Sequence, residues 1–405
     1  MQSFDELNLP PQLSRVLKKI GFEKPTKIQS QAIPLLLAER DLMACAETGS
    51  GKTGAYLIPM VKALMENPQP QGLVLAPTRE LAQLISDFLK TLVQSDRSFP
   101  ISLLVGGQDI RKQFKSLKSK PRIVIATPGR LIDHLNRKTL KIHKVQHLVL
   151  DEGDRMIDMG FAPQLEQILK FLPKHRQTSF FTATLDKKVK SLAEKYLVDP
   201  ETLLLDEARP VATIKQSVVQ VAAKDKDNHI VSELKKRDGS VIVFVKTKRR
   251  TDELRKHLFE YGFAVDLIHG GRSQGQRNQA ISKFKNGKTR ILCATDVAAR
   301  GIDVPHVQHV INFDLPMQDE DYVHRVGRTA RNGAHGEAVS FVSPSEHRQW
   351  NRLAKKYEIP GRPLEGSDRE ESRGKKKGKR PFRFSNQRRK KNSRGQGGQK
   401  RSPRA

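Results

Sequence analysis

A glycine-rich stretch, ACAETGSGKTGA at residues 44–55, has the composition of a phosphate-binding loop. Gly49 and Gly51 permit a tight turn whose backbone N–H groups point inward at phosphate oxygens, and the helix expected next adds its dipole. Lys52 would then reach the β and γ phosphates of a nucleotide, and the hydroxyl of Thr53 would ligate Mg²⁺. The strict pattern GxxxxGK[ST] has glycine at its first position, where this chain has Ala46. Taken alone, the stretch could also be a glycine-rich turn with an exposed lysine.

An acidic stretch, VLDEGDRMIDMGF at residues 149–161, follows an apolar run. Its three carboxylates, Asp151, Glu152 and Asp154, could form a magnesium and water-activating site or merely an acidic turn, which the intervening glycine favours. In P-loop nucleoside triphosphatases a second acidic strand end holds the Mg²⁺. Asp151 suits a water-mediated contact to the metal, and Glu152 is placed to polarise a water against the γ-phosphate. Together with the glycine-rich loop, the pair favours nucleoside triphosphate hydrolysis.

Short apolar runs of strand length recur between longer segments of helical period. Those of the first half are LMACAETG, GLVLAPT, SLLVGG, RIVIATPG, HLVLDEGD and TSFFTAT; those of the second are SVIVFVKT, AVDLIHGG, TRILCATD, HVINFD and EAVSFV. Continuous apolar strands separated by amphipathic helices such as TRELAQLISDFLKTLVQ indicate parallel sheets covered on both faces, hence an α/β fold. Ligands of such sheets bind beyond the carboxyl ends of the strands, so the residues after each run are expected to form the site.

The chain is long enough for two domains and a tail. A polar, proline-containing stretch predicts a linker at 207–217 between a first domain at 1–206 and a second at 218–362. The remaining residues, 363–405, have almost no aliphatic side chains, and we expect this tail to be disordered. Within it, residues 373–405 hold 15 Lys or Arg and no acid, so this part supplies half of the net charge of +30. Such a balance favours a polyanionic partner, although basic tails can also serve only solubility.

The two cysteines, Cys45 and Cys293, lie in separate apolar runs and show no metal-ligand spacing. They are expected to be buried thiols in a reducing compartment. No apolar stretch approaches the 18 residues typical of a membrane span, and the first residues lack the pattern of a signal peptide. We therefore expect a cytoplasmic protein.

Many short motifs, in the expected order over nearly all of residues 1–345, resemble those of DEAD-box RNA helicases. In chain order they are GFEKPTKIQ at 21–29, AETGSGKT at 46–53, PTREL at 77–81, GG at 106–107, TPGR at 127–130, DEGD at 151–154, TAT at 182–184, VFVKT at 243–247, QxxR at 274–277, ATDVAARGID at 294–303 and HRVGRTAR at 324–331. Alanine at the start of the phosphate-binding motif is the norm in this family. Any one motif could arise by chance, but the ordered set could not.

The resemblance implies two tandem RecA-like domains, ATP and Mg²⁺ as cofactors, and RNA as the partner. It assigns nucleotide contacts to Phe22 on the adenine face, Gln29 on the adenine edge, Thr48, Gly49, Ser50, Gly51, Lys52, Thr53 and, at the ribose, Asp303. It assigns catalysis to Lys52, Asp151, Glu152 and two arginine fingers, Arg328 and Arg331, with Thr53 and Asp151 at the metal. It assigns RNA binding to Pro77, Arg79, Gly107, Thr127, Gly129, Arg130, Thr247, Arg277 and Thr295, and the coupling of ATP to RNA to Asp154, Thr182, Thr184, Arg300 and His324.

Plainer interpretations of some motifs stay open. HRVGRTAR could be an exposed basic helix, and Thr78 or Thr127 could simply cap a helix. The residues nevertheless agree with the resemblance, because the dense arginine cluster lies in the second domain and the phosphate-binding loop in the first. Hydrolysis would then require the two domains to close around ATP.

The leading hypothesis is an RNA-dependent ATPase that clamps single-stranded RNA between two domains and locally unwinds short duplexes. The alternative is an ATP-gated RNA-binding or annealing chaperone with weak unwinding, and a DNA helicase is a third, disfavoured option. One position departs from the family, because Gly153 replaces the alanine of DEAD. Considered as a loss of one methyl and a gain of backbone freedom, it predicts at most looser coupling, and Gly153→Ala is expected to leave the basal ATPase within a few fold.

Overall fold

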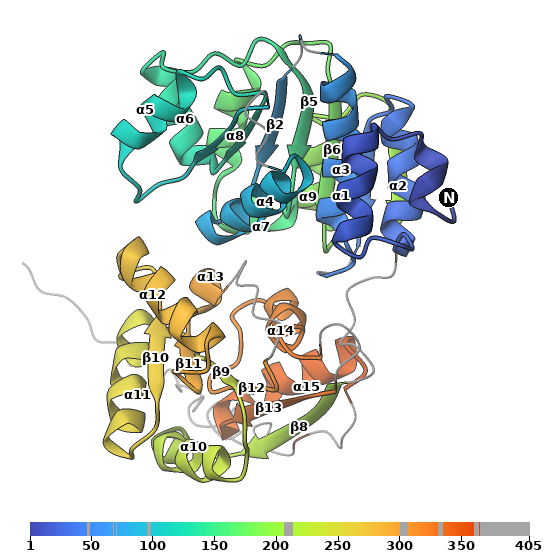
Figure 1. The fold of residues 1–405 in the computed structure, drawn as a ribbon. Helices are drawn as coiled ribbons and strands as arrows, with labels where there is room; N and C mark the ends of the chain where they lie inside the picture. Colours follow the sequence, from blue (N-terminus) through green and yellow to red (C-terminus); the bar gives the residue numbers. More distant parts are fainter. Residues whose placement is uncertain are drawn as a thin grey trace, which may run out of the picture. The chain divides into compact units, whose positions relative to one another are not determined.

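The computed structural model describes residues 1–46, 49–67, 69, 71–94, 99–205, 214–299, 307–330, 335–359 and 364. These residues form two α/β lobes, each built around its own parallel sheet with helices on both faces (Figure 1). In the described ranges, no helix is both long enough and apolar enough to cross a membrane. The expected fold class, two tandem α/β domains, is confirmed.

The N-terminal lobe has a seven-stranded sheet among its described residues, in the order β3-β4-β2-β5-β6-β1-β7, and every pairing is parallel. Its strands are β1 (Leu42–Cys45), β2 (Gln71–Leu75), β3 (Ile101–Leu104), β4 (Ile123–Ala126), β5 (Val145–Leu150), β6 (Gln177–Thr182) and β7 (Glu201–Leu204). Its helices are η1 (Phe4–Leu7), α1 (Pro11–Lys19), α2 (Lys27–Leu37), α3 (Lys52–Glu66), α4 (Arg79–Leu92), α5 (Ile110–Leu117), α6 (Pro128–Asn136), α7 (Gly153–Asp158), α8 (Ala162–Leu169) and α9 (Lys187–Ala193).

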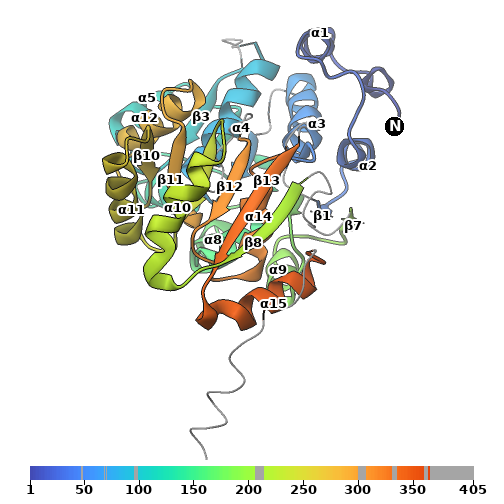
Figure 2. The ribbon, with the colours of Figure 1, turned by 90° about the horizontal axis from the view of Figure 1, so that it is seen from below.

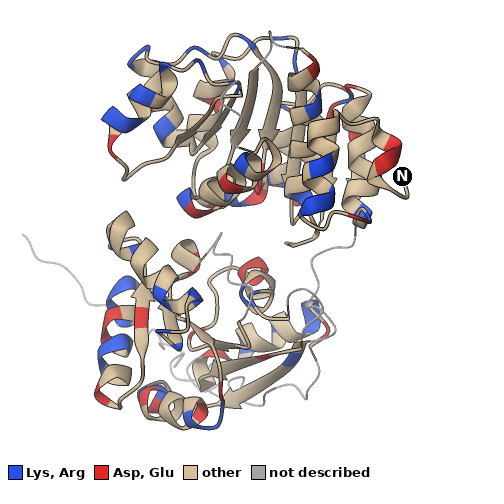
Figure 3. Ribbon diagram, in the orientation of Figure 1, with Lys and Arg blue, Asp and Glu red and all other residues tan. Residues whose placement is uncertain are grey.

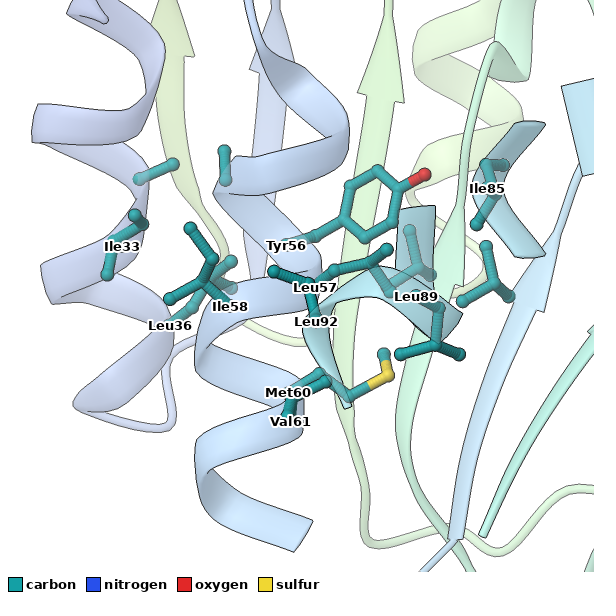
Figure 4. Packing of buried hydrophobic residues seen from close by; sticks show 14 of the residues in the cluster. Ile33, Leu36, Tyr56, Leu57, Ile58, Met60, Val61, Ile85, Leu89 and Leu92 are labelled. Atoms are coloured by element: carbon teal, nitrogen blue, oxygen red, sulfur yellow. The ribbon is translucent and has the colours of Figure 1, made fainter. Parts of the chain in front are cut away.

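Two apolar cores sandwich this sheet, because successive residues of a strand face opposite sides. Helices α1 to α4 pack on one face, where Tyr56, Leu57 and Met60 of α3 lie beside Ile85 and Leu89 of α4 (Figure 4). Helices α5 to α9 pack on the other face. Because both faces are covered, β1, β2 and β4 are apolar nearly throughout, as the sequence predicted, and β6 is buried nearly throughout.

The C-terminal lobe has a six-stranded parallel sheet among its described residues, in the order β10-β11-β9-β12-β13-β8 (Figure 2). The strands are β8 (Ile214–Gln220), β9 (Val241–Phe244), β10 (Val265–Ile268), β11 (Ile291–Ala294), β12 (His309–Asn312) and β13 (Gly336–Val342). The helices are η2 (Ala223–Asp225), α10 (Lys226–Lys235), α11 (Lys248–Glu260), α12 (Gln274–Lys285), α13 (Asp296–Ala299), α14 (Asp319–Val326), η4 (Pro344–Glu346) and α15 (His347–Lys356). Helices α10 and α11 pack on one face of the sheet and α12 to α15 on the other.

All eleven apolar runs identified in the sequence contain strands, but β7 and β8 were missed. Both are edge strands with alternating burial, so neither has a continuous apolar sequence. Because β8 begins at Ile214, the last four residues of the expected linker, 214–217, belong to a strand instead. The rest of that linker, and the tail at 363–405 apart from residue 364, lie outside the described residues.

Charged side chains are carried mainly by the helices and loops of both lobes, and the strands are nearly free of them (Figure 3). Both cysteines are buried and neither forms a disulfide bond, as expected, and burial raises the pKa of the Cys293 thiol to about 12. The Cys293 thiol is therefore unreactive at neutral pH.

Candidate active site

The glycine-rich loop leads from β1 into α3, whose first residue is Lys52. Gly49 and Gly51 both have positive φ, of 88° and 96°, a region that non-glycine residues rarely adopt. Lys52 is nearly buried, and its Nζ donates a 2.7 Å hydrogen bond to the Ala46 carbonyl, which draws the amine back across the loop. The turn therefore has the expected geometry of a phosphate cradle. Thr48 lies outside the described residues.

Gln29 of α2 packs directly on this loop. Its Nε2 donates to the Gly51 carbonyl at 3.1 Å, and its Oε1 accepts from the Thr26 backbone N–H at 3.0 Å. A Cβ on Gly51 would lie 2.7 Å from Gln29 Nε2, and one on Gly54 would lie 2.8 Å away, so a side chain at either position would have to displace the Gln29 amide. The glutamine motif and the phosphate-binding loop are thus one packed unit.

Phe22, expected on the adenine face, lies in a row of aromatic rings. Its centroid is 5.7 Å from that of Phe4 and 5.7 Å from that of Phe88, on which it stacks. Aromatic pairs at such distances stabilise one another beyond their buried area. The ring is therefore held at the edge of the N-terminal lobe, beside Gly54 of the helix that follows the loop.

Asp151 follows β5 at the carboxyl edge of the sheet and is almost fully buried. Its Oδ2 accepts a 2.8 Å hydrogen bond from the hydroxyl of Tyr56, and its Oδ1 accepts from the Glu152 N–H at 2.9 Å. Burial raises the pKa of Asp151 to about 6, against the opposing effect of Lys52. Burial likewise raises the pKa of Tyr56, so its hydroxyl stays a donor. The acidic stretch is thus a packed strand end and not a solvated turn.

Tyr56 was missed in the sequence, although its spacing from Lys52 was a usable signal. Residues four apart lie on the same face of a helix, so a polar group at position 56 follows the catalytic lysine along α3. Tyr56 also packs on Phe181 of β6, with ring centroids 5.2 Å apart. This packing orients the hydroxyl toward Asp151.

Glu152 has a positive φ of 52°, which is unusual for a residue with a side chain. Its carboxylate is buried, and Oε2 lies 3.4 Å from Nε of Arg155 without a hydrogen-bond partner among the described residues. Arg155 is also fully buried, and its guanidinium nitrogens make no hydrogen bond to a described residue. Because buried polar atoms are nearly always satisfied, Glu152 keeps an acceptor oxygen that a reacting water could use.

Asp154 holds the Thr182-Ala183-Thr184 segment through its Oδ2. This oxygen accepts from the backbone N–H of Ala183 at 3.2 Å, from that of Thr184 at 3.1 Å, and from the Thr184 hydroxyl at 3.2 Å. The Thr182 hydroxyl in turn donates to the Thr184 carbonyl at 2.7 Å. The contact expected between the acidic stretch and this segment is present.

Residues expected to bind RNA gather in the N-terminal lobe after several strand ends. A cavity of about 490 Å³ is lined in this lobe by Pro77, Thr78, Arg79, Glu80, Gly106, Thr127, Gly129, Arg130, Asp133, Met159 and Phe161. Gly107 has φ 74°, and a Cβ there would overlap with Nη1 of Arg79, so the guanidinium packs over the double glycine. Thr78 also caps α4 by accepting from the Leu81 N–H, whereas Thr127 caps α6 without such a bond.

The expected RNA-binding residues of the C-terminal lobe occupy the starts of helices and a strand end. Thr247 is exposed and caps α11 by accepting from the Arg250 N–H at 3.2 Å. Thr295 is buried just after β11. Arg277 on α12 donates to the Ala298 carbonyl at 3.3 Å.

Glu80, not expected from the sequence, pairs with groups of the C-terminal lobe. Its Oε1 lies 3.0 Å from Nη2 of Arg277 and accepts from Nε2 of Gln274 at 2.9 Å. The neighbouring Arg79 donates to Oε1 of the same Gln274 at 3.3 Å. Two arginines assigned to RNA therefore lie within one polar network.

Arg325, the first arginine of HRVGRTAR, was also missed. It is fully buried and pairs through two nitrogens with Asp296, at 2.5 Å and 2.7 Å. Arg328 is nearly buried, and its Nε donates to the His324 carbonyl at 3.2 Å. The motif is thus a packed helix end and not a solvated basic segment. Arg300, Asp303 and Arg331 lie outside the described residues.

A glycine-rich loop, a buried acidic strand end and two parallel α/β lobes define a P-loop nucleoside triphosphatase with tandem RecA-like lobes. Family models agree: residues 26–192 match "DEAD/DEAH box helicase" and residues 225–333 match "Helicase conserved C-terminal domain". The chain is 42% identical over 347 residues to the DEAD-box ATP-dependent RNA helicase CshA of Bacillus subtilis, which covers 85% of this chain and 70% of the relative. It is 44% identical to the ATP-dependent rRNA helicase rrp3 of Aspergillus niger, over 89% of this chain and 79% of the relative.

Solved structures show the same architecture. S. cerevisiae Dbp5 bound to RNA and ADP BeF3 matches with a TM-score of 0.81 and 32% identity, covering 89% of this chain and 95% of that one. Mss116p bound to ssRNA and AMP-PNP matches with a TM-score of 0.80 and 32% identity, covering 90% and 79%. This chain therefore belongs to the DEAD-box family of ATP-dependent RNA helicases, with DEGD in place of DEAD, and is an ATP-hydrolysing enzyme.

Proposed function

We propose that this enzyme is an RNA-dependent ATPase that clamps single-stranded RNA between its lobes and locally separates short duplexes. The observation that carries the proposal is the set of hydrogen bonds that Asp154 accepts from Ala183 and Thr184. Asp154 belongs to the same short stretch as Glu152, which would activate the attacking water. A change at the γ-phosphate would therefore be transmitted to the segment that couples ATP to RNA.

Hydrolysis would use three described side chains in distinct roles. Lys52 would leave the Ala46 carbonyl to contact the β and γ phosphates, and Glu152 would accept a proton from the attacking water through Oε2, which makes no hydrogen bond to a described residue. Arg328 would stabilise the charge that develops on the transferred phosphoryl group. Because Arg328 lies in the other lobe, hydrolysis would require closure, and Arg331 is proposed to act beside it.

The donors present fit Mg²⁺, which proteins usually bind with one or two carboxylates together with substrate phosphates and waters. Among the described residues, no three His, Cys, Asp or Glu side chains gather into a metal-binding group. The cation would thus be held by Asp151 and Thr53 together with the nucleotide. When bound, it would neutralise charge on the β and γ phosphate oxygens.

RNA would be held mainly through its backbone. Arg79, Thr127 and Arg130 line one cavity and supply guanidinium, hydroxyl and backbone N–H groups suited to phosphates and sugars. The relatives solved with bound RNA support this assignment, and contacts to 2′-hydroxyls would select RNA over DNA. We also propose that the enzyme works in the cytoplasm, since neither of its two buried cysteines forms a disulfide bond.

The test is ATP turnover by the full chain with and without RNA, for the wild type and Glu152→Gln. We expect RNA to stimulate the wild type and the variant to lose about 100-fold or more of its kcat. Glu166→Gln is the matched control, because it neutralises an exposed glutamate that pairs with Lys195. Absence of RNA stimulation, or full activity of Glu152→Gln, would refute the mechanism. Strand separation of a short RNA duplex then distinguishes unwinding from annealing.

A further inference from the structure

The glycine of DEGD is required by space and not by backbone conformation. Gly153 is the first residue of α7, and its φ lies outside the left-handed region, so the backbone there suits any residue. A Cβ at this position, however, would meet three atoms of the Phe180 ring. It would lie 3.0 Å from Cε2, and Cζ and Cε1 would be closer still. The ring occupies the space of the missing side chain.

Phe180 cannot easily move away, because it is fully buried in the core between the sheet and helices α5 to α9. On the two neighbouring strands it is paired in register with Leu150 of β5 and Met43 of β1. Leu150 is the last residue before Asp151. The ring therefore lies directly beneath the point where the catalytic strand turns into α7.

The two residues that flank Gly153 carry the chemistry. Glu152 is held at an unfavourable positive φ, and Asp154 makes its three hydrogen bonds from the next position. Close-packed interiors transmit such displacements, so a side chain forced between α7 and the ring would displace both carboxylates.

We propose that Phe180 is a positioning residue for the catalytic stretch, and that Gly153 is its steric complement. Contact with the ring fixes the distance between the start of α7 and the sheet, and this distance determines where Glu152 and Asp154 lie. This inference rests on the proposed role of Glu152 as the base. It also reverses the expectation from the sequence, which considered only the backbone and predicted that Gly153→Ala would be tolerated.

The overlap between a Cβ on residue 153 and Phe180 involves only the outer atoms of the ring. A leucine retains side-chain carbons out to the δ position and lacks Cε1, Cε2 and Cζ, the three atoms that a Cβ on residue 153 would meet. Phe180→Leu should therefore create the room that Gly153→Ala needs. The pair can be exchanged together, whereas either single change leaves an overlap or a void.

The experiment measures kcat and KM for ATP, with saturating RNA, for Gly153→Ala, Phe180→Leu and the double variant. We expect Gly153→Ala to lose about tenfold or more in kcat, because small displacements of catalytic groups are costly. KM should stay within about twofold of the wild type, because Gln29 and Lys52, which are expected to bind ATP, lie on other elements. Phe180→Leu should lose about threefold in kcat. The double variant should return to within about threefold of the wild type.

Gly72→Ala is the matched control for simple overpacking. Residue 72 lies on β2 of the same lobe, away from the acidic stretch, and a Cβ there would lie 2.7 Å from Sδ of Met60. It should lower the melting temperature without changing kcat at a temperature where the protein is folded. Folded Gly153→Ala with kcat within twofold of the wild type, or a double variant no faster than Gly153→Ala, would overturn the inference.

If Gly153→Ala does not fold, the double variant decides the question. It must then fold and hydrolyse ATP, and its failure to do so counts against the pairing. A wild type without RNA-stimulated turnover would instead refute the proposed function, so the two failures are distinguishable.

Discussion

The hydroxyl of Tyr56 on α3 donates a 2.8 Å hydrogen bond to Oδ2 of Asp151, joining the helix of the phosphate-binding loop to the acidic strand end. Both residues are almost fully buried, so neither has water as an alternative partner. This bond holds the carboxylate that is proposed to bind Mg²⁺ in one orientation.

Tyr56→Phe should therefore destabilise the N-terminal lobe and slow hydrolysis. The change leaves Oδ2 of Asp151 without this donor, which typically costs about 1–3 kcal/mol for a buried group. We expect a several-fold fall in kcat, measured by steady-state ATP turnover, and a lower free energy of unfolding, measured with denaturant. Tyr196→Phe is the control, because that buried hydroxyl donates to the Leu165 carbonyl away from the active site. Equal effects of both variants on kcat would contradict the role of Tyr56.

Asp151→Asn should abolish ATP hydrolysis and yet stabilise the nucleotide-free protein at neutral pH. The pKa of Asp151 is raised from 3.8 to about 6 in the folded state, so the folded protein binds the proton more tightly. This carboxyl therefore makes the wild type lose stability as pH rises from about 4 to about 6, by roughly 3 kcal/mol in total at 1.36 kcal/mol per pKa unit.

The measurement is chemical unfolding of both proteins in EDTA without nucleotide, at several pH values. The difference between the two free energies of unfolding should grow over that pH window in favour of Asp151→Asn and then stay constant above about pH 7. A difference independent of pH would show that the pKa of Asp151 is not raised.

Asp154→Ala should weaken RNA stimulation more than basal hydrolysis. It removes the acceptor of three hydrogen bonds that hold Ala183 and Thr184, while Glu152 remains. The ratio of RNA-stimulated to basal turnover should fall about fivefold or more, a coupling of the usual size between sites. Asp41→Ala is the control, since that buried carboxylate accepts from the N–H groups of Thr178 and Val198. If both variants lower the ratio alike, the effect reflects stability and not coupling.

Arg325→Lys should destabilise the C-terminal lobe much more than Arg352→Ala. Arg325 is fully buried and makes a bidentate ion pair with Asp296, whose two parallel hydrogen bonds a lysine cannot reproduce. Disrupting a buried pair costs about 3–5 kcal/mol when a charge is left unpaired, so a loss of about 2 kcal/mol or more is expected. Arg352 makes a similar bidentate pair with Asp319 but is largely exposed, and its loss should cost less than about 1 kcal/mol. Equal losses in denaturant unfolding would rule out a structural role for the buried pair.

Deleting residues 363–405 should weaken RNA binding and leave duplex separation intact. Its residues 373–405 contribute half of the net charge, and each phosphate that they neutralise steepens the dependence of affinity on salt. Binding isotherms at several salt concentrations should show a shallower slope for the truncated chain. Loss of strand separation with normal ATP turnover would instead favour the annealing role of the tail.

The sequence alone determined the architecture and most of the chemistry, for identifiable physical reasons. Parallel strands buried on both faces need continuous apolar runs, so eleven of the described strands could be predicted from the sequence. The edge strands β7 and β8 alternate in burial and could not be predicted in this way. Gly49 and Gly51 adopt the positive φ that their motif predicts, and Asp154 contacts Thr184 as the resemblance to the family implied.

Only the tertiary structure decided what surrounds the catalytic carboxylates. Tyr56, Arg155 and Phe180 are ordinary core residues in the sequence, because nothing local specifies which strand end a side chain will meet. In the sequence, Gly153 differs from the family alanine by one methyl, and the expectation drawn from it was a gain of backbone freedom. In the fold it lies against a ring contributed by another strand, and close packing between distant segments makes the glycine necessary.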